Sequence, residues 1–134
     1  MPILRVDRYT REDVRRWGEA GAIVVFGDNC CRSGTANQAV IRGLSNAVGV
    51  ATKRRPDMRP DAFFSDDRAD EYIAIIDRDL EPVRAALRAG KLVVLPAAGL
   101  GTGLAQLPTR APRVWAFLSA ALVQLERIAA SAAS

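Results

Sequence analysis

The sequence contains no histidine, and its two cysteines, Cys30 and Cys31, are adjacent. The lack of histidine excludes Ser-His and Cys-His catalytic pairs, so acid–base chemistry would depend on carboxylates, lysine or bound water. Neighbouring cysteines rarely bridge each other, and there is neither a CxxC spacing nor a histidine to complete a zinc site. We therefore expect two reduced cysteines in or near a loop, and neither a metal site nor a cofactor.

Long apolar runs are also missing. No run reaches the roughly 18 residues of a transmembrane helix, and the N-terminus, MPILRVDRYTRED, has no apolar core of a signal peptide. The 134 residues are 49% hydrophobic and 25% charged, which is typical of a globular protein. The sequence thus predicts a cytoplasmic protein with one domain over residues 1–134 and no membrane partner.

Basic residues are in mild excess, with a formal net charge of +4. They gather in one run, Lys53, Arg54, Arg55 and Arg59, and near the N-terminus. Such clusters can bind nucleic-acid phosphates. Only 6% of the residues are aromatic and none interrupts the 53–59 run, so a stacking platform for single strands is not supported. A solvated basic face and a nucleic-acid surface both remain open.

Strand and helix patterns alternate along the chain. Thr10 can cap a helix over 11–19, with acidic residues in its first turn. Pro82 lies inside a long helical pattern that starts at Ser65 or Asp66 and ends at Gly90, so we expect a kink or break near Leu80–Glu81. The last helix ends in a tail, 129–134, that we expect to fray. The strand candidates are Ile3–Val6, Ala22–Phe26, Ala47–Thr52 and Leu92–Leu95, and a short helix is expected over Asn37–Arg42.

This alternation predicts an α/β fold, a three-layer α/β/α sandwich with a mainly parallel or mixed sheet. In such sheets ligands bind beyond the carboxyl ends of the strands. Two glycine-containing segments follow predicted strands there: GDNCCRSGT after AIVVF, and AAGLGTG after LVVL. Glycine-rich turns can direct several backbone N–H groups at one anion, and a following helix N-terminus adds positive potential. The two segments together predict a diphosphate site, although neither is a Walker loop or a Rossmann GxGxxG motif.

The segment LPAAGLGTGLAQLP, between a strand and an amphipathic helix, resembles the second half of a macro domain, the ADP-ribose-binding module. LRVDRYTRED and VVFGDNCCRSGTANQAVIR resemble its opening strand with an acidic turn and its first phosphate loop. The sequences FGDN, NQAVIRG and NAVGVATKRRP also resemble small proteins that are common in phages and bacteria. This resemblance covers most of the chain and implies a macro-like fold.

The resemblance also implies roles for particular residues. Asp7 would bind the adenine amino group, and Asn29 would lie near the distal ribose. One phosphate loop would use Gly34 and Thr35. The other would use Gly99, Leu100, Gly101, Thr102, Gly103 and Leu104. Asn37 and Gln38 stand where the family often has a second small residue, so the sequence departs from the pattern there.

One macro subgroup removes ADP-ribose from carboxylate side chains with a lysine and an aspartate. VATKRRPDMRP resembles the segment with that lysine, which makes Lys53 its match. The aspartate expected in the glycine loop is missing, because Gly103-Leu104-Ala105 stands there. Asp28, Asp66 or Asp67 would have to replace it.

Three functions therefore remain open. The first is binding of ADP-ribose or a related nucleotide, free or attached to a macromolecule, without catalysis. The second is hydrolysis of an ADP-ribosyl or nucleotide glycosidic bond by Lys53 with Asp28. The third is a basic nucleic-acid-binding module. The paired loops favour the first two functions, and the missing aspartate favours binding over hydrolysis.

Overall fold

The computed structural model describes residues 3–133, which form a four-stranded parallel sheet between two layers of helices. The strands lie in the order β1-β4-β2-β3. They are β1 (Ile3–Val6), β2 (Ile23–Asn29), β3 (Ala47–Lys53) and β4 (Val93–Pro96). The helices are α1 (Arg11–Glu19), α2 (Ala69–Arg88), α3 (Leu107–Arg110) and α4 (Pro112–Ala133), with 3-10 helices η1 (Asn37–Ile41), η2 (Pro60–Ala62) and η3 (Asp66–Arg68). The predicted α/β sandwich is confirmed.

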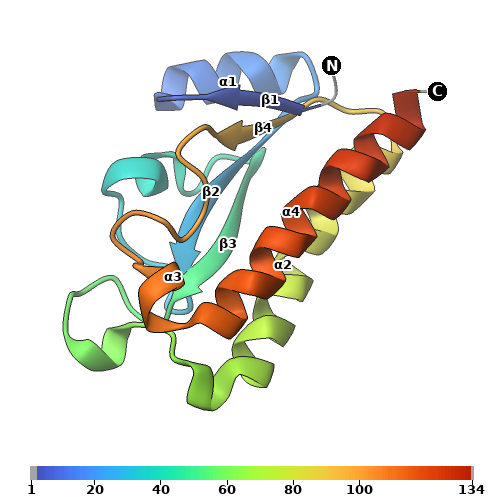
Figure 1. Cartoon of the computed structure of the whole chain (residues 1–134). Helices are drawn as coiled ribbons and strands as arrows, with labels where there is room; N and C mark the ends of the chain where they lie inside the picture. Colours follow the sequence, from blue (N-terminus) through green and yellow to red (C-terminus); the bar gives the residue numbers. More distant parts are fainter. Residues whose placement is uncertain (1–2, 134) are drawn as a thin grey trace.

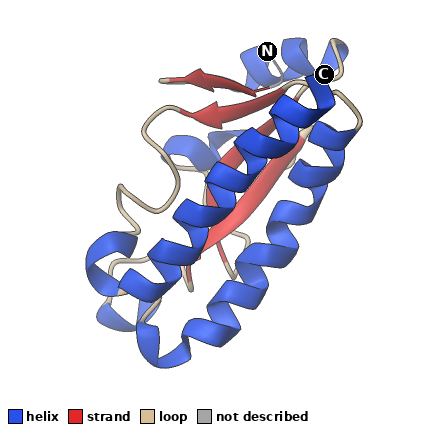
Figure 2. Cartoon of the chain, turned by 45° about the vertical axis from the view of Figure 1, so that its right-hand side comes forward, coloured by secondary structure: helices blue, strands red, loops and turns tan. Residues whose placement is uncertain are grey.

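The long helices α2 and α4 pack side by side on one face of the sheet (Figures 1 and 2). Their apolar stripes, which include Ile76, Leu80, Leu118 and Leu125, are fully buried against the sheet. The opposite face is covered by α1 and η1, which meet β2 and β4 through a smaller core around Val14, Val24, Phe26, Ile41 and Val94. Strand residues alternate between the two cores, as the period of two of a strand requires.

Several local predictions are confirmed. Thr10 caps α1 with a capping box, in which the Thr10 hydroxyl accepts from the Asp13 N–H and the Asp13 carboxylate accepts from the Thr10 N–H. The Thr10 N–H lowers the pKa of Asp13. The predicted strands and helices all occur, with ends shifted by a few residues.

Three local predictions are wrong. The helix does not break at Pro82, because α2 is continuous from Ala69 to Arg88 and buries Leu80 and Val83 on either side of the proline. The alternative, a kink, stays a prediction. Asp28 and Asn29, expected in a loop, are the last residues of β2. The tail does not fray over 129–133, since α4 continues to Ala133 and Ala129 packs in the core. Residue 134 lies outside the described part of the chain.

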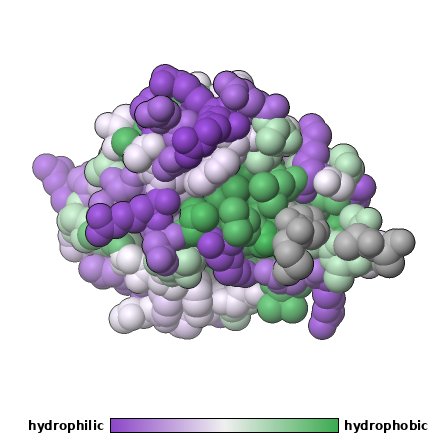
Figure 3. Space-filling view, turned by 90° about the horizontal axis from the view of Figure 1, so that it is seen from above, coloured by the Kyte–Doolittle hydropathy of each residue, from purple (hydrophilic) through white to green (hydrophobic). Residues whose placement is uncertain are grey.

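Among the described residues, one helix has the length and hydropathy of a membrane span, α4 from Pro112 to Ala132. Its stripe of buried residues belongs to the main core, as described above. Large apolar side chains reach the surface at four described positions, Leu4, Met58, Leu104 and Val123. The face in Figure 3 is mostly hydrophilic around one apolar area. Some exposed apolar side chains are normal for a globular surface.

Candidate functional site

The connections that leave neighbouring strands turn to opposite faces of the sheet. From β2 the chain passes to η1, on the α1 face, whereas from β4 it passes to α4, on the other face. Because β2 and β4 are adjacent, their connections separate and leave a crevice at the carboxyl edge. We name residues 30–36 the first loop and residues 97–106 the second loop. The two predicted segments therefore do meet at one edge.

A pocket of about 300 Å³ lies between the two loops. This volume is at the lower end of the range of about 300–1,000 Å³ that is usual for small-molecule sites. Its lining includes eight of the predicted site residues, and these are Asp28, Asn29, Gly34, Lys53, Gly99, Gly101, Gly103 and Leu104. Thr52, Gln38 and Ser33 line it as well.

The other predicted residues lie outside this pocket. Leu100 is buried in the main core, and the Thr102 hydroxyl donates a hydrogen bond to the Ala98 carbonyl within the second loop. Thr35 is exposed in the first loop and is not part of the pocket lining. Asp7 lines a second pocket, of about 480 Å³, which shares Asn37 and Gln38 with the first. The two pockets therefore lie on either side of Asn37 and Gln38.

The three glycines of the second loop have different reasons to be glycine. Gly99 and Gly101 have φ angles of +89° and +80°, which residues other than glycine rarely adopt. A Cβ on Gly101 would also lie 2.8 Å from Leu107 Cδ2. Gly103 has neither constraint, since no atom lies within 4 Å of the position of its missing Cβ. The first two glycines thus shape the loop, and Gly103 keeps space open beside the pocket.

Both loops carry backbone donors that the protein itself does not use. Within residues 3–133, the N–H groups of residues 100–105 donate to no other group, and those of residues 33–36 do not either. Buried N–H groups are normally paired, and in the second loop Leu100, Gly101 and Ala105 are buried residues. Residues 33–36 are exposed, so water can satisfy their N–H groups. Both rows are free to donate to an anion. The pocket wall also holds one buried acceptor without a partner, Asn29 Oδ1, whereas Asn29 Nδ2 donates to the Ser33 carbonyl.

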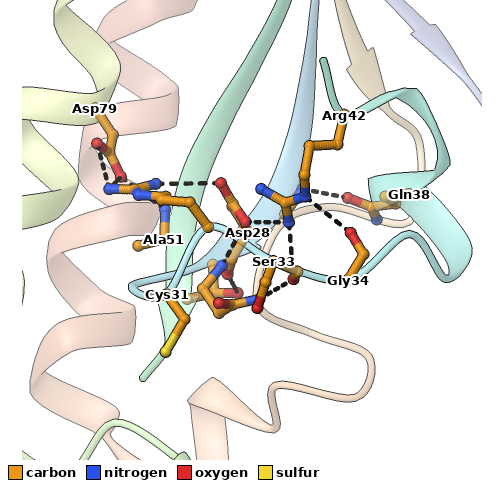
Figure 4. Close-up of polar contacts among 12 residues, drawn as sticks. Asp28, Cys31, Ser33, Gly34, Gln38, Arg42, Ala51 and Asp79 are labelled. Carbon is orange, nitrogen blue, oxygen red and sulfur yellow. Dashed lines mark hydrogen bonds and ion pairs between the residues drawn. The ribbon is translucent and has the colours of Figure 1, made fainter. Parts of the chain in front are cut away.

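Asp28 lies at the centre of an ion-pair network behind the first loop (Figure 4). Its buried carboxylate accepts from Arg42 at 2.5 Å, from Arg32 at 3.3 Å and from the Asn29 N–H at 2.8 Å. Arg32 also binds both oxygens of Asp79 on α2, and Asp79 accepts from the Ala51 N–H of the edge strand β3. The carboxylate of Asp28 is therefore occupied by two guanidinium groups.

Gly49 makes room for this carboxylate. A Cβ on Gly49 would lie 2.4 Å from Asp28 Oδ2, closer than any real contact. Roles for Arg32, Arg42, Gly49 and Asp79 were not predicted from the sequence. The fold brings these residues together from the first loop, the residue after η1, β3 and α2.

The ammonium group of Lys53 bonds to the segment that follows β3 and not to Asp28. Its ammonium donates to the carbonyls of Asp57 at 2.7 Å and Pro56 at 3.4 Å, and it lies 4.6 Å from the centre of the Phe63 ring. Burial lowers the pKa of Lys53. These contacts tie the end of β3 to the following segment, 54–62.

Asp66 and Asp67, the other candidates for the catalytic carboxylate, also have hydrogen-bond partners. Asp66 accepts the N–H groups of Arg113 and Val114 at the start of α4, and Asp67 accepts the Ser65 hydroxyl. Both carboxylates therefore stabilise local structure.

One arginine of the basic run is paired with neighbouring acidic residues. Arg55 pairs with Asp57 and Asp61, and Arg54 donates to the Asp61 carbonyl. The Arg59 N–H lowers the pKa of Asp57, and the hydrogen bond from Arg55 lowers that of Asp61. Arg55 is therefore less available to a nucleic-acid phosphate than its place in the run suggests.

The fold and the site define a small α/β protein with a glycine-lined pocket at the carboxyl edge of a parallel sheet. The chain belongs to a family of unknown function, DUF7831, whose model matches residues 4–121. The match includes both loops and every residue of the Asp28 network. No curated protein and no solved structure matches the chain.

Proposed function

We propose that the chain binds ADP-ribose or a closely related nucleoside diphosphate in the pocket between the two loops. The observation that carries this proposal is the pair of loops with unused N–H groups, 33–36 and 100–105, on opposite sides of one pocket. N–H groups arranged in this way favour a phosphate, and two such rows favour a diphosphate. The nucleoside part rests on the sequence resemblance to macro domains.

The polar groups of the two pockets suit the rest of such a ligand. Asn29 lines the pocket beside the first loop, where it would lie next to a ribose. Asp7 lies in the adjoining pocket, where its carboxylate can accept from an adenine amino group. The shared wall of Asn37 and Gln38 then lies beside the diphosphate.

The contacts of the two proposed catalytic residues favour binding over hydrolysis. A carboxylate that acts as a general base must lie within reach of the proton that it removes, and a lysine nucleophile needs a free amine. Asp28 is held by two guanidinium groups, and the Lys53 ammonium by two carbonyls. The pairing of Arg55 with Asp57 and Asp61 likewise weakens the case for a nucleic-acid surface.

The first test is calorimetric titration of the protein with ADP-ribose, with AMP and NAD for comparison, at low and high salt. We expect one-to-one binding that depends weakly on salt, because one diphosphate displaces few counterions. Affinity that falls steeply with salt, or binding to RNA in place of ADP-ribose, would support the nucleic-acid function instead.

A matched pair of variants tests the place of the ligand. Gly103→Val puts a side chain beside the pocket without a strained φ angle, and we expect it to weaken binding at least tenfold. Ala98→Val changes an exposed residue of the same loop outside the pocket lining, and should leave the affinity unchanged. Equal affinities for both variants would show that the ligand binds elsewhere.

We also propose that the protein is located in the cytoplasm. It is supported by the compact α/β domain and by Cys30 and Cys31, which are exposed free thiols. A ligand attached to a protein or nucleic acid would have to enter at the exposed rim formed by Leu104 and the first loop.

A further inference from the structure

The short helix η1 contacts both loops of the proposed site. The side chains of Gln38, within this helix, and Arg42, the residue that follows it, reach in different directions. Figure 4 shows Arg42 directed toward Asp28, Ser33 and Gly34. No other described element makes side-chain hydrogen bonds to the backbone of both loops.

Arg42 holds the first loop from the side away from the pocket. Its Nε donates to the Gly34 carbonyl at 2.8 Å, and its Nη2 donates to the Ser33 carbonyl at 3.1 Å and to Asp28. Arg42 is not part of the pocket lining. Since it fixes the carbonyls of this loop, it also fixes the orientation of the adjoining peptide N–H groups.

Gln38 joins the second loop to the centre of the sheet. Its Oε1 accepts from the Gly27 N–H at 2.7 Å, and its Nε2 donates to the Gly99 carbonyl at 3.3 Å. A Cβ on Gly27 would lie 3.2 Å from this Oε1, so the lack of a side chain at Gly27 leaves room for the Gln38 amide. Gln38 thereby sets the distance between β2 and the second loop.

Helix η1 itself is firmly anchored. Ile41 is fully buried in the smaller core, and Arg11 on α1 donates to the carbonyls of Val40 and Arg42 at 3.0 and 2.8 Å. A rigid element thus carries both contacts, which is what a preorganised site needs from its supporting residues.

We propose that Arg42 and Gln38 are positioning residues that hold the two loops at a fixed separation and keep their N–H groups directed into the pocket. Asp28 then serves as the anchor of Arg42. This inference rests on the proposed function, since it assigns the residues that prepare the same site for its diphosphate. Preorganisation of this kind raises affinity because little loop entropy is lost when the ligand binds.

The test compares Arg42→Gln with Arg15→Gln, a control at an exposed arginine of α1. Backbone ¹⁵N relaxation without ligand measures the order of residues 33–36, and calorimetry measures the affinity for ADP-ribose. For Arg42→Gln we expect order parameters to fall from about 0.85 to below about 0.6. The affinity should fall at least tenfold, whereas the control should match the wild type in both.

Two results would overturn the inference. The first is a loop that stays ordered in Arg42→Gln, whatever happens to the affinity. The second is a loosened loop with an affinity within twofold of the wild type. If the wild-type protein binds no ADP-ribose, the proposed function fails, and the relaxation measurement alone decides whether Arg42 holds the loop.

A second variant covers the case in which Arg42→Gln does not fold. Gln38→Met keeps the volume of the side chain but removes both amide hydrogen bonds. We expect lower order parameters in residues 100–105 and unchanged ones in residues 33–36. Unchanged order in both loops would overturn the role of Gln38, and loosening of both would show general destabilisation in place of positioning.

Discussion

The two loops of the site are built to the same purpose by different physical means. The second loop is held by backbone conformation and packing, since Gly99 and Gly101 have positive φ angles, and Leu100 is buried in the core. The first loop is held by charges, through Arg42, Arg32 and the buried Asp28. Neutral packing is insensitive to salt and pH, whereas ion pairs respond to both. The two walls of one pocket should thus respond differently to the same perturbation.

The largest expected effect comes from the packed loop. Gly101→Ala forces alanine into a left-handed φ and brings its Cβ within 2.8 Å of Leu107 Cδ2. The strained backbone and the overpacked contact together should lower the free energy of unfolding by about 3 kcal/mol. Urea denaturation measures this loss. Gly103→Ala in the same loop is the control, and a loss there as large as for Gly101→Ala would contradict the division of roles among the glycines.

The second effect reaches the charged loop from a distance. Gly49→Ala places a Cβ too close to Asp28 Oδ2, so the carboxylate must shift relative to its arginine partners. We expect a loss of about 2 kcal/mol in unfolding free energy, because a buried charge loses its optimal pairing. The loss should largely disappear in an Asp28→Ala background, where the carboxylate is absent. Additive effects of the two changes would mean that Gly49 acts in some other way.

A smaller effect is expected at the exposed end of the network. Arg32→Gln removes the pairs with Asp79 and Asp28, but Asp28 keeps Arg42 and Asp79 keeps the Ala51 N–H. Since the Arg32 side chain is 40% exposed, solvent screens its pairs, and we expect a loss of about 1 kcal/mol in urea denaturation. The difference between wild type and Arg32→Gln should shrink in 1 M salt. A salt-independent difference would indicate that Arg32 acts by packing.

The sequence predicted the packed loop better than the charged one. Glycine spacing and flanking prolines are local signals, so LPAAGLGTG identified the second loop and its neighbouring strand. Hydrophobic periodicity likewise predicted the sheet and the helices. The mistakes at Pro82 and at the C-terminal tail have one cause, since tertiary packing outweighed local propensity.

The charged loop shows what one sequence cannot supply. Asp28, Arg42 and Asp79 lie far apart along the chain, and each is an ordinary charged residue in an ordinary local pattern. Only the parallel sheet and the helix layers bring them within hydrogen-bond distance. The resemblance suggested Lys53 as a catalytic residue, with Asp28 as one possible replacement for the aspartate missing from the glycine loop. Their side-chain contacts instead direct them to Arg42 and to the 54–62 segment.

The smallest expected effect is that of acid, which should change the segment held by ion pairs and leave the packed loop unchanged. Asp57 and Asp61 hold Arg55 in segment 54–62, and the Arg59 N–H and Arg55 lower their respective pKa values. Because the folded pKa values are lowered, this stabilisation is present above the ordinary carboxyl pKa of about 3.9 and is lost as the pH falls through the folded values. Amide chemical shifts followed from pH 6 to pH 2 should therefore move in segment 54–62. Residues 97–106 contain no ionisable side chain and serve as the internal control. Equal shifts in that loop would mean that acid loosens the whole fold, and that packing does not isolate the second loop from the charges around it.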